Sequence, residues 1–153
     1  MRRALAALAL VAVASACDSG APAGDDARAD PRDGGRVARG ASIYAQHCAT
    51  CHGAKLEGQP NWRVRLPNGR MPAPPHDESG HTWHHPDRVL FEITKNGVVP
   101  PYAPAGYATD MPAFAATLVD EEIWSVLAYI KSHWISAEVL AARREMIENV
   151  KRR

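Results

Sequence analysis

The chain has 153 residues, of which 46% are hydrophobic and 23% charged, and its formal net charge is +1. This length provides for one domain and little more. The nearly neutral balance argues against a protein that binds nucleic acid, or that adheres to an anionic membrane surface through its own charge.

Residues 1–16 have the pattern of a secretory signal peptide. Arg2 and Arg3 precede a short apolar run, and small residues lead up to Cys17. The run is too short to remain as a membrane span. Cys17 comes directly after these small residues, as the lipidated cysteine does in a bacterial lipobox. The pattern therefore fits either ordinary signal-peptide cleavage or lipidation of this cysteine. We favour lipidation, because an unpaired exported thiol otherwise needs a reason, and it would anchor the chain on the periplasmic side of the bacterial membrane.

Residues 17–35 are expected to form a flexible linker after the signal peptide. They consist mainly of Asp, Gly, Ala, Pro, Ser and Arg and contain no bulky apolar side chain that could join a core. The domain itself is assigned to residues 36–135, and a helical extension to residues 136–153.

The first helix of the domain is predicted over residues 37–48. Gly40, Ile43, Tyr44 and His47 recur at spacings of three and four on one face. Gly40 has no Cβ, so another helix can pack closely against it. The helix leads directly into the next motif and is expected to position it.

The most specific motif of the chain is Cys48-Ala49-Thr50-Cys51-His52. It has the spacing of a c-type haem attachment site, in which both thiols form thioethers with the haem vinyl groups and the histidine is the proximal iron ligand. A zinc site would require a second pair of ligands, and a redox-active pair would require βαβ surroundings. A structural disulfide would leave His52 unexplained. We therefore predict one covalently bound haem c.

Residues 53–75 have no helical period and contain many prolines and glycines, so they are expected to wrap the haem as a loop. Trp62 stands in this polar stretch. Its indole N–H can donate to a buried haem propionate, although a plain packing role explains it equally well.

The second helix is predicted from Pro86, which suits a first helical turn, to the stop signal at Asn96-Gly97. A histidine cluster precedes it: His76, His81, His84 and His85. These side chains can bind a metal, cap the helix or bond the loop. The lack of an accompanying cysteine or clear carboxylate disfavours the metal.

Met111 is the predicted distal iron ligand. It lies in a second loop rich in proline and glycine, just before Pro112. A thioether favours ferrous iron and raises the redox potential. Met71 and Met146 are alternatives, and each methionine can simply fill the core. We favour Met111 because it is far enough from His52 along the chain to reach the opposite haem face.

The last helix of the domain is predicted over residues 120–134. Its apolar face is formed by Ile123, Trp124, Leu127, Ile130 and Trp134. This face is expected to cross the first helix near Gly40 and Tyr44. Residues 136–153 carry only a thin apolar stripe, which favours a solvated helix.

Together these features resemble the class I c-type cytochromes with a single haem. The resemblance covers residues 37–134 and rests mainly on the haem motif and Met111-Pro112. It implies an all-α, cytochrome c-like fold whose helices wrap around one covalently attached haem. By the same resemblance, a carbonyl next to Pro60 accepts the second N–H of the proximal histidine.

The predicted function is to carry single electrons rather than to act as an enzyme, because axial ligation by His52 and Met111 leaves no position for a substrate. A terminal oxidase or a periplasmic dehydrogenase is the expected class of partner. Two alternatives remain: a gas or peroxide sensor or haem enzyme with an open distal side, and a metal-handling protein that uses His81, His84 and His85.

Overall fold

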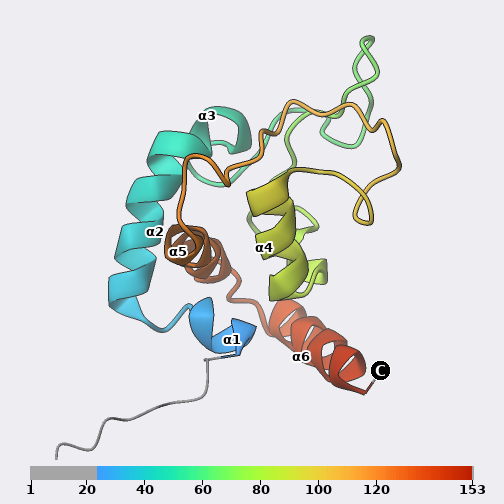
Figure 1. Cartoon of the computed structure of the whole chain (residues 1–153). Helices are drawn as coiled ribbons and strands as arrows, with labels where there is room; N and C mark the ends of the chain where they lie inside the picture. Colours follow the sequence, from blue (N-terminus) through green and yellow to red (C-terminus); the bar gives the residue numbers. More distant parts are fainter. Residues whose placement is uncertain (1–23, 153) are drawn as a thin grey trace, which may run out of the picture.

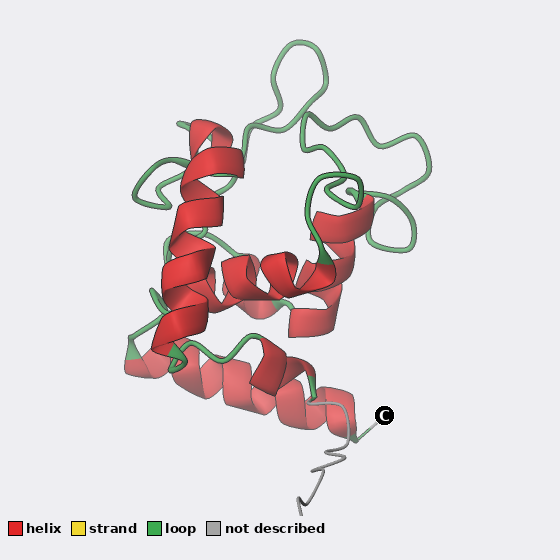
Figure 2. Ribbon diagram, turned by 60° about the vertical axis from the view of Figure 1, so that its left-hand side comes forward, coloured by secondary structure: helices red, strands yellow, loops and turns green. Residues whose placement is uncertain are grey.

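The computed structural model describes residues 24–152, which form helices joined by loops and contain no strand (Figures 1 and 2). The predicted all-α fold is thereby confirmed. The predicted signal peptide and Cys17 lie outside the described residues. Within residues 24–152, no helix combines the length and the apolar character that crossing a bilayer would require.

The centre of the fold is the crossing of α2 (Gly34–His47) with α5 (Asp120–Lys131). At the crossing point a Cβ on Gly40 would overlap the carbonyl oxygen of Ser125, so only glycine allows this approach. One turn further on, the rings of Tyr44 and Tyr129 pack with centroids 5.3 Å apart. The predicted crossing near Gly40 and Tyr44 is therefore confirmed.

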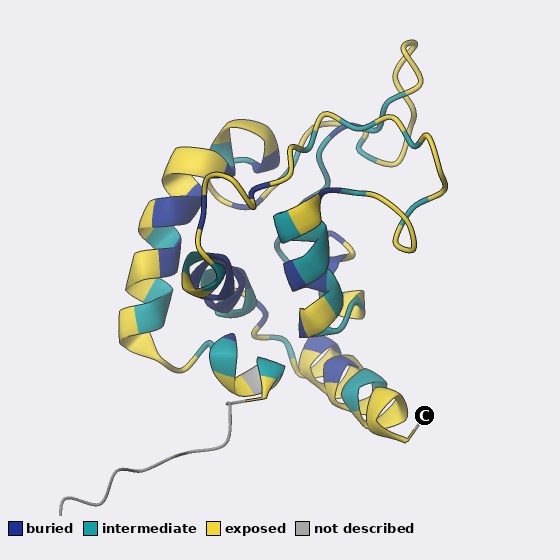
Figure 3. Cartoon of the chain, in the orientation of Figure 1, coloured by how far each residue is buried: buried dark blue, intermediate teal, exposed yellow. Residues whose placement is uncertain are grey.

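Helix α4 (Asp87–Asn96) packs against α5, and part of α4 is buried (dark blue in Figure 3). The ring of Phe91 stacks on that of Trp124, with centroids 4.3 Å apart and nearly parallel planes. Both side chains are buried. The two helices thus form one continuous apolar wall.

Residues 24–35, predicted to be part of the flexible linker, are folded against the domain instead. A short helix, α1 (Asp25–Arg28), leads to Ala29, which is fully buried. The Arg28 guanidinium lies 4.8 Å from the ring centre of Trp124 and pairs with Glu121. Hydropathy does not register ion pairs or cation–π contacts. The prediction of a flexible linker is therefore wrong for residues 24–35.

Helix α6 (Ala137–Lys151) also departs from expectation, because it packs on the domain rather than lying solvated. Val139 and Arg143 are buried, and α6 contacts the 3₁₀ turn η1 (Thr82–His84) that precedes α4. The last domain helix ends at Lys131, earlier than predicted. Trp134 nevertheless stays buried, and its indole N–H donates to the carbonyl of His76 over 2.9 Å.

Candidate functional site

The cysteine motif is wound into helix at the end of α2. The Cys48 N–H bonds to the carbonyl of Tyr44, and the short helix α3 (Ala49–His52) follows, with the His52 N–H bonded to the carbonyl of Cys48. Residues three and four apart share a helical face. Cys48, Cys51 and His52 therefore point to the same side, where all three line one cavity.

This cavity has a volume of about 650 Å³ and lies among α3, α4, α5 and the two long loops of the chain. Its apolar wall includes Leu90 from α4 and Val126, Leu127 and Ile130 from α5. A mostly apolar cavity of this size suits a large organic cofactor. The two sulfurs of the motif are not joined to each other in a disulfide.

The imidazole of His52 is held in one orientation. Its Nδ1 lies 2.8 Å from the carbonyl oxygen of Pro74, so Nδ1–H donates there and Nε2 is left to bind a metal. Burial lowers the pKa of His52 and keeps the ring neutral, as coordination requires, although the bond to Pro74 opposes this shift. The accepting carbonyl is thus that of Pro74, and the prediction for Pro60 is wrong.

The turn after the motif brings Pro74 to His52 through tight backbone packing. Leu56 adopts a φ of 65°, unusual for a side chain of this size, and is 1% exposed. Its carbonyl accepts the N–H of His76 over 2.8 Å. Gly58, with a φ of 68°, lies where a Cβ would overlap the backbone nitrogen of Pro75. These contacts hold the loop that carries Pro74 next to the cysteine motif.

His76 is a cavity residue whose place the sequence did not reveal. Its ring stacks on that of His52, with centroids 3.8 Å apart. Its Nδ1 is buried and has no hydrogen-bond partner among residues 24–152, and burial places its pKa well below the ordinary value. An unpaired polar atom in a mostly apolar cavity is expected where a bound group supplies the partner.

Two of the three candidate methionines reach the cavity. Met71 and Met111 both line it, each half-buried. The Met111 N–H donates to the hydroxyl oxygen of Thr109 over 3.0 Å, and its side chain packs on the hydrophobic core. Arg70 donates to the carbonyl of Thr109 and so braces the same turn. Met111 thus differs from Met71 in that its side chain packs on the hydrophobic core.

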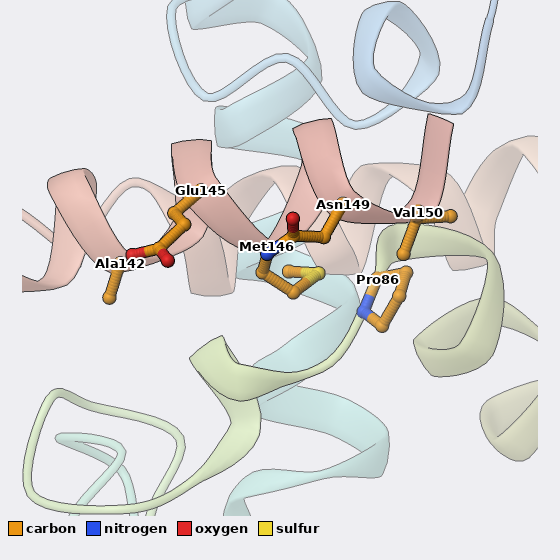
Figure 4. A pocket seen from close by; sticks show the side chains of 6 residues that line it. All are labelled: Pro86, Ala142, Glu145, Met146, Asn149 and Val150. Carbon is orange, nitrogen blue, oxygen red and sulfur yellow. The ribbon is translucent and has the colours of Figure 1, made fainter. Parts of the chain in front are cut away.

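Met146 lies elsewhere. It lines a shallow hollow between α6 and the start of α4, together with Pro86, Asn149 and Val150 (Figure 4). None of the cavity residues described above takes part in this hollow. Met146 is thus separated from His52, and it is excluded as its axial partner.

The histidine cluster is divided by the fold. His81 and His85 line the cavity next to Trp62, whose ring stacks on that of His81 with centroids 5.3 Å apart. His84 stacks instead on Trp83, 3.6 Å away, and does not line the cavity. Within the described part of the chain, no three His, Cys, Asp or Glu residues form a group that could hold a metal ion. The metal-handling alternative therefore has no geometric support.

The side chains of the cavity fit a covalently attached haem. Two thiols at the required spacing, a neutral imidazole with one nitrogen available, and two thioethers lie around one apolar space. The unpaired Nδ1 of His76 adds a polar atom that a haem substituent can satisfy. No such combination surrounds the hollow on α6.

Comparison with known proteins agrees with this site. Residues 35–130 match the family described as cytochrome c oxidase, cbb3-type, subunit III. The chain is 30% identical to a gluconate 2-dehydrogenase cytochrome c subunit from Pantoea cypripedii over 95 residues, which is 62% of the chain. The match covers 20% of that relative, so the chain spans only a small part of its length. No solved structure matches the chain.

Proposed function

The chain belongs to the family of cytochrome c oxidase, cbb3-type, subunit III, and is a class I c-type cytochrome with covalently attached haem c. We propose that it transfers electrons through this haem and that four side chains hold the haem in place. Cys48 and Cys51 form the thioethers, His52 is the proximal ligand and Met111 the distal one. The observation that carries the proposal is that all four side chains line one cavity, in which His52 is oriented by Pro74.

Each residue has a distinct task in this arrangement. When bound, the haem supplies one-electron exchange between ferric and ferrous iron. The hydrogen bond from His52 to Pro74 fixes the tautomer of the imidazole and makes it a stronger ligand for iron. The Met111 thioether favours the reduced state. One electron enters from a reduced donor and leaves to an oxidised acceptor, and no bond to a substrate is made or broken.

The test of the ligand set is the far-red absorption of the oxidised, haem-loaded protein. A weak sulfur-to-iron charge-transfer band is expected in the wild type and should disappear in Met111→Ala. The redox potential should fall by on the order of 100 mV or more, within the ~0.8 V range that axial ligands control. The matched control is Met71→Ala, which should keep both the band and the potential.

The opposite result would reassign the site. A band that survives in Met111→Ala and disappears in Met71→Ala would make Met71 the distal ligand. Binding of carbon monoxide to the reduced wild type at neutral pH would instead support the sensor or haem-enzyme alternative, with His81 or His85 facing the ligand. The electron carrier predicts little or no such binding.

For the partner, we propose a redox protein such as a dehydrogenase. The support is the relative from Pantoea cypripedii, which is named as the cytochrome c subunit of a dehydrogenase. We further propose that the chain is exported and held at the periplasmic side of the membrane by lipidated Cys17. Mass spectrometry of the mature protein tests this, since an unmodified N-terminus would exclude the anchor.

A further inference from the structure

Two loops project at one end of the molecule, beside α3 and away from α6 (Figure 1). They comprise residues 59–70 and 98–110, and both contribute side chains to the lining of the haem cavity. The loops are fastened to each other, because Arg70 pairs with Asp110 and the guanidinium of Arg65 lies 5.7 Å from the ring centre of Tyr107. They therefore form one surface at the cavity, which we call the two-loop rim.

The two-loop rim exposes an unusual share of apolar surface. Eight large hydrophobic side chains are exposed among residues 24–152, and four of them belong to it. These are Val64 at 62%, Leu66 at 42%, Val99 at 45% and Tyr102 at 39% exposure. Leu66 and Tyr102 also line the cavity, so the exposed apolar surface reaches the cofactor site. Apolar surface gathered at a functional site marks a contact with another molecule.

The charge of the two-loop rim is positive. It contains Arg63, Arg65 and Arg70, and its single acidic residue, Asp110, is engaged by Arg70. Arg63 lies over the ring of Trp62 and Arg65 over that of Tyr107, and within the described residues neither forms an ion pair with a carboxylate. Arg65 also donates to the carbonyl of Gly69 over 2.8 Å, but this bond leaves its charge unneutralised. Two positive charges thus remain available to an external anion.

Several arginines elsewhere in the chain form ion pairs with carboxylates. Arg28 and Arg36 both pair with Glu121, and Arg39 pairs with Glu122. Those charges are neutralised within the fold and serve its packing. Arg144 on α6 likewise has no carboxylate partner within the described residues, but it lies away from the cavity. Arg63 and Arg65 are set apart by their place in loops that line the cavity.

We propose that the two-loop rim is the docking surface for the redox partner, and that the partner presents acidic side chains around a small apolar patch next to its own redox centre. The inference rests on the electron-carrier function proposed above. Long-range attraction between the arginines and the acidic groups speeds and orients the encounter, and the apolar contact brings the two redox centres close. A small interface of this kind permits rapid release.

The experiment uses two reductants of different charge. Reduced flavodoxin serves as a small acidic protein with an exposed flavin edge, and reduced riboflavin as an uncharged reagent. The rate of haem reduction is followed by stopped flow at low ionic strength in wild type, in Arg63→Glu/Arg65→Glu and in Arg144→Glu. Arg144 is the matched control, because it is exposed on α6, away from the two-loop rim.

We expect Arg63→Glu/Arg65→Glu to react with flavodoxin about tenfold or more slowly, since electrostatic steering changes association rates by factors of ~10–10³. The difference should vanish near 1 M salt, where the screening length is only about 3 Å. Reduction by riboflavin should be unchanged, and Arg144→Glu should behave as wild type. A rate with flavodoxin within twofold of wild type, or an equal loss in Arg144→Glu, would overturn the proposal.

Two further outcomes separate the underlying assumptions. If neither reductant transfers an electron to the wild type, the proposed electron transfer itself fails. If riboflavin reduces every variant equally and flavodoxin does too, only the docking surface is refuted. A membrane role is tested with phosphatidylglycerol vesicles: loss of vesicle binding in Arg63→Glu/Arg65→Glu, with an unchanged flavodoxin rate, would assign the two-loop rim to lipid and refute the protein partner.

Discussion

Gly40 shows how a single missing side chain determines the central helix crossing. At this position a Cβ would overlap the backbone carbonyl of Ser125 and lie 2.8 Å from the Cβ of Tyr129. Backbone atoms within a helix cannot move aside as a flexible side chain can. A larger residue must therefore separate α2 from α5, and α2 is the helix that leads into the cysteine motif.

We predict that Gly40→Ala lowers the free energy of unfolding by about 1–3 kcal/mol, as overpacking of a close contact does. Denaturant unfolding of the haem-loaded protein measures the loss. Gly34→Ala is the control in the same helix, because a Cβ there meets nothing within 4 Å. This control should lose no stability, since alanine is the better helix former. Equal midpoints for Gly40→Ala and wild type would refute the account of the crossing.

At the scale of elements, one buried ionic cluster joins three helices. Asp87 at the start of α4 accepts hydrogen bonds from Lys131 of α5 and, over 2.6 Å, from Arg143 of α6. Arg143 also donates to the carbonyls of Trp83 and His85, over 2.9 and 3.1 Å. The C-terminal helix thereby holds the segment that carries His85 along the cavity.

We predict that Arg143→Met destabilises the fold by about 3 kcal/mol, because a buried carboxylate loses a partner and two carbonyls lose their donor. Thermal or denaturant unfolding gives the difference. The neighbouring exposed residue provides the control, and Arg144→Met should change stability by less than about 0.5 kcal/mol. If the two variants are equally stable, α6 does not contribute through this cluster.

The attachment of α1 gives a prediction about pH. Hydrogen bonds from Arg28 and then Arg36 lower the pKa of Glu121 from its ordinary value of 4.5. A carboxyl whose pKa is lower in the folded state stabilises the fold above pH 4.5, and this contribution is lost as the pH falls through the lowered value. Because the Glu121 side chain is 52% exposed, solvent screens the pair and its contribution to stability is small.

We therefore expect Glu121→Gln to be less stable than wild type by up to about 1 kcal/mol at pH 7. The two proteins should converge as the pH is lowered below the pKa of the folded protein. Denaturant midpoints across this range test the sign. Arg144→Gln, an exposed change on α6 that leaves every carboxyl group in place, is the control and should keep a constant difference from wild type. A gap between Glu121→Gln and wild type that widens on acidification would contradict the assigned cause.

The cavity occupies the place that a solid core fills in other domains. Its volume is about 650 Å³, and helices α4 and α5 pack on each other beside it. When no bound group covers its apolar wall, that surface stays in water, which costs roughly 25 cal/mol for each Å² of apolar area. The haem is therefore expected to be part of the core.

We predict that Cys48→Ala/Cys51→Ala, which cannot attach haem, does not unfold cooperatively. Its near-ultraviolet circular dichroism should be lost while helical signal in the far ultraviolet partly remains. Met111→Ala is the control, since it keeps the covalent attachment and should still unfold in one transition. A sharp calorimetric transition in the double variant near the wild-type midpoint would show that the core is stable without the cofactor.

Features that depend on local spacing could be predicted from the amino-acid sequence alone. Apolar residues three and four apart predicted α2 and α5, and the start and stop signals at Pro86 and Asn96-Gly97 predicted α4. Cys48-Ala49-Thr50-Cys51-His52 predicted the cofactor. All of these signals are carried by neighbouring residues. The resemblance to class I c-type cytochromes and the all-α fold followed from the same features. The assignment of His52 and Met111 as ligands remains a prediction.

The partners of groups far apart along the chain became evident only in the folded structure. Pro74 rather than Pro60 accepts from His52, 22 residues away; Arg143 reaches Asp87 across 56 residues, and Arg28 reaches Glu121 across 93. No local pattern encodes such partners, because polar side chains in loops and at helix ends have no period. Their pairing is set by how α2, α4 and α5 pack around the cavity, and this packing brings groups together irrespective of their separation along the chain.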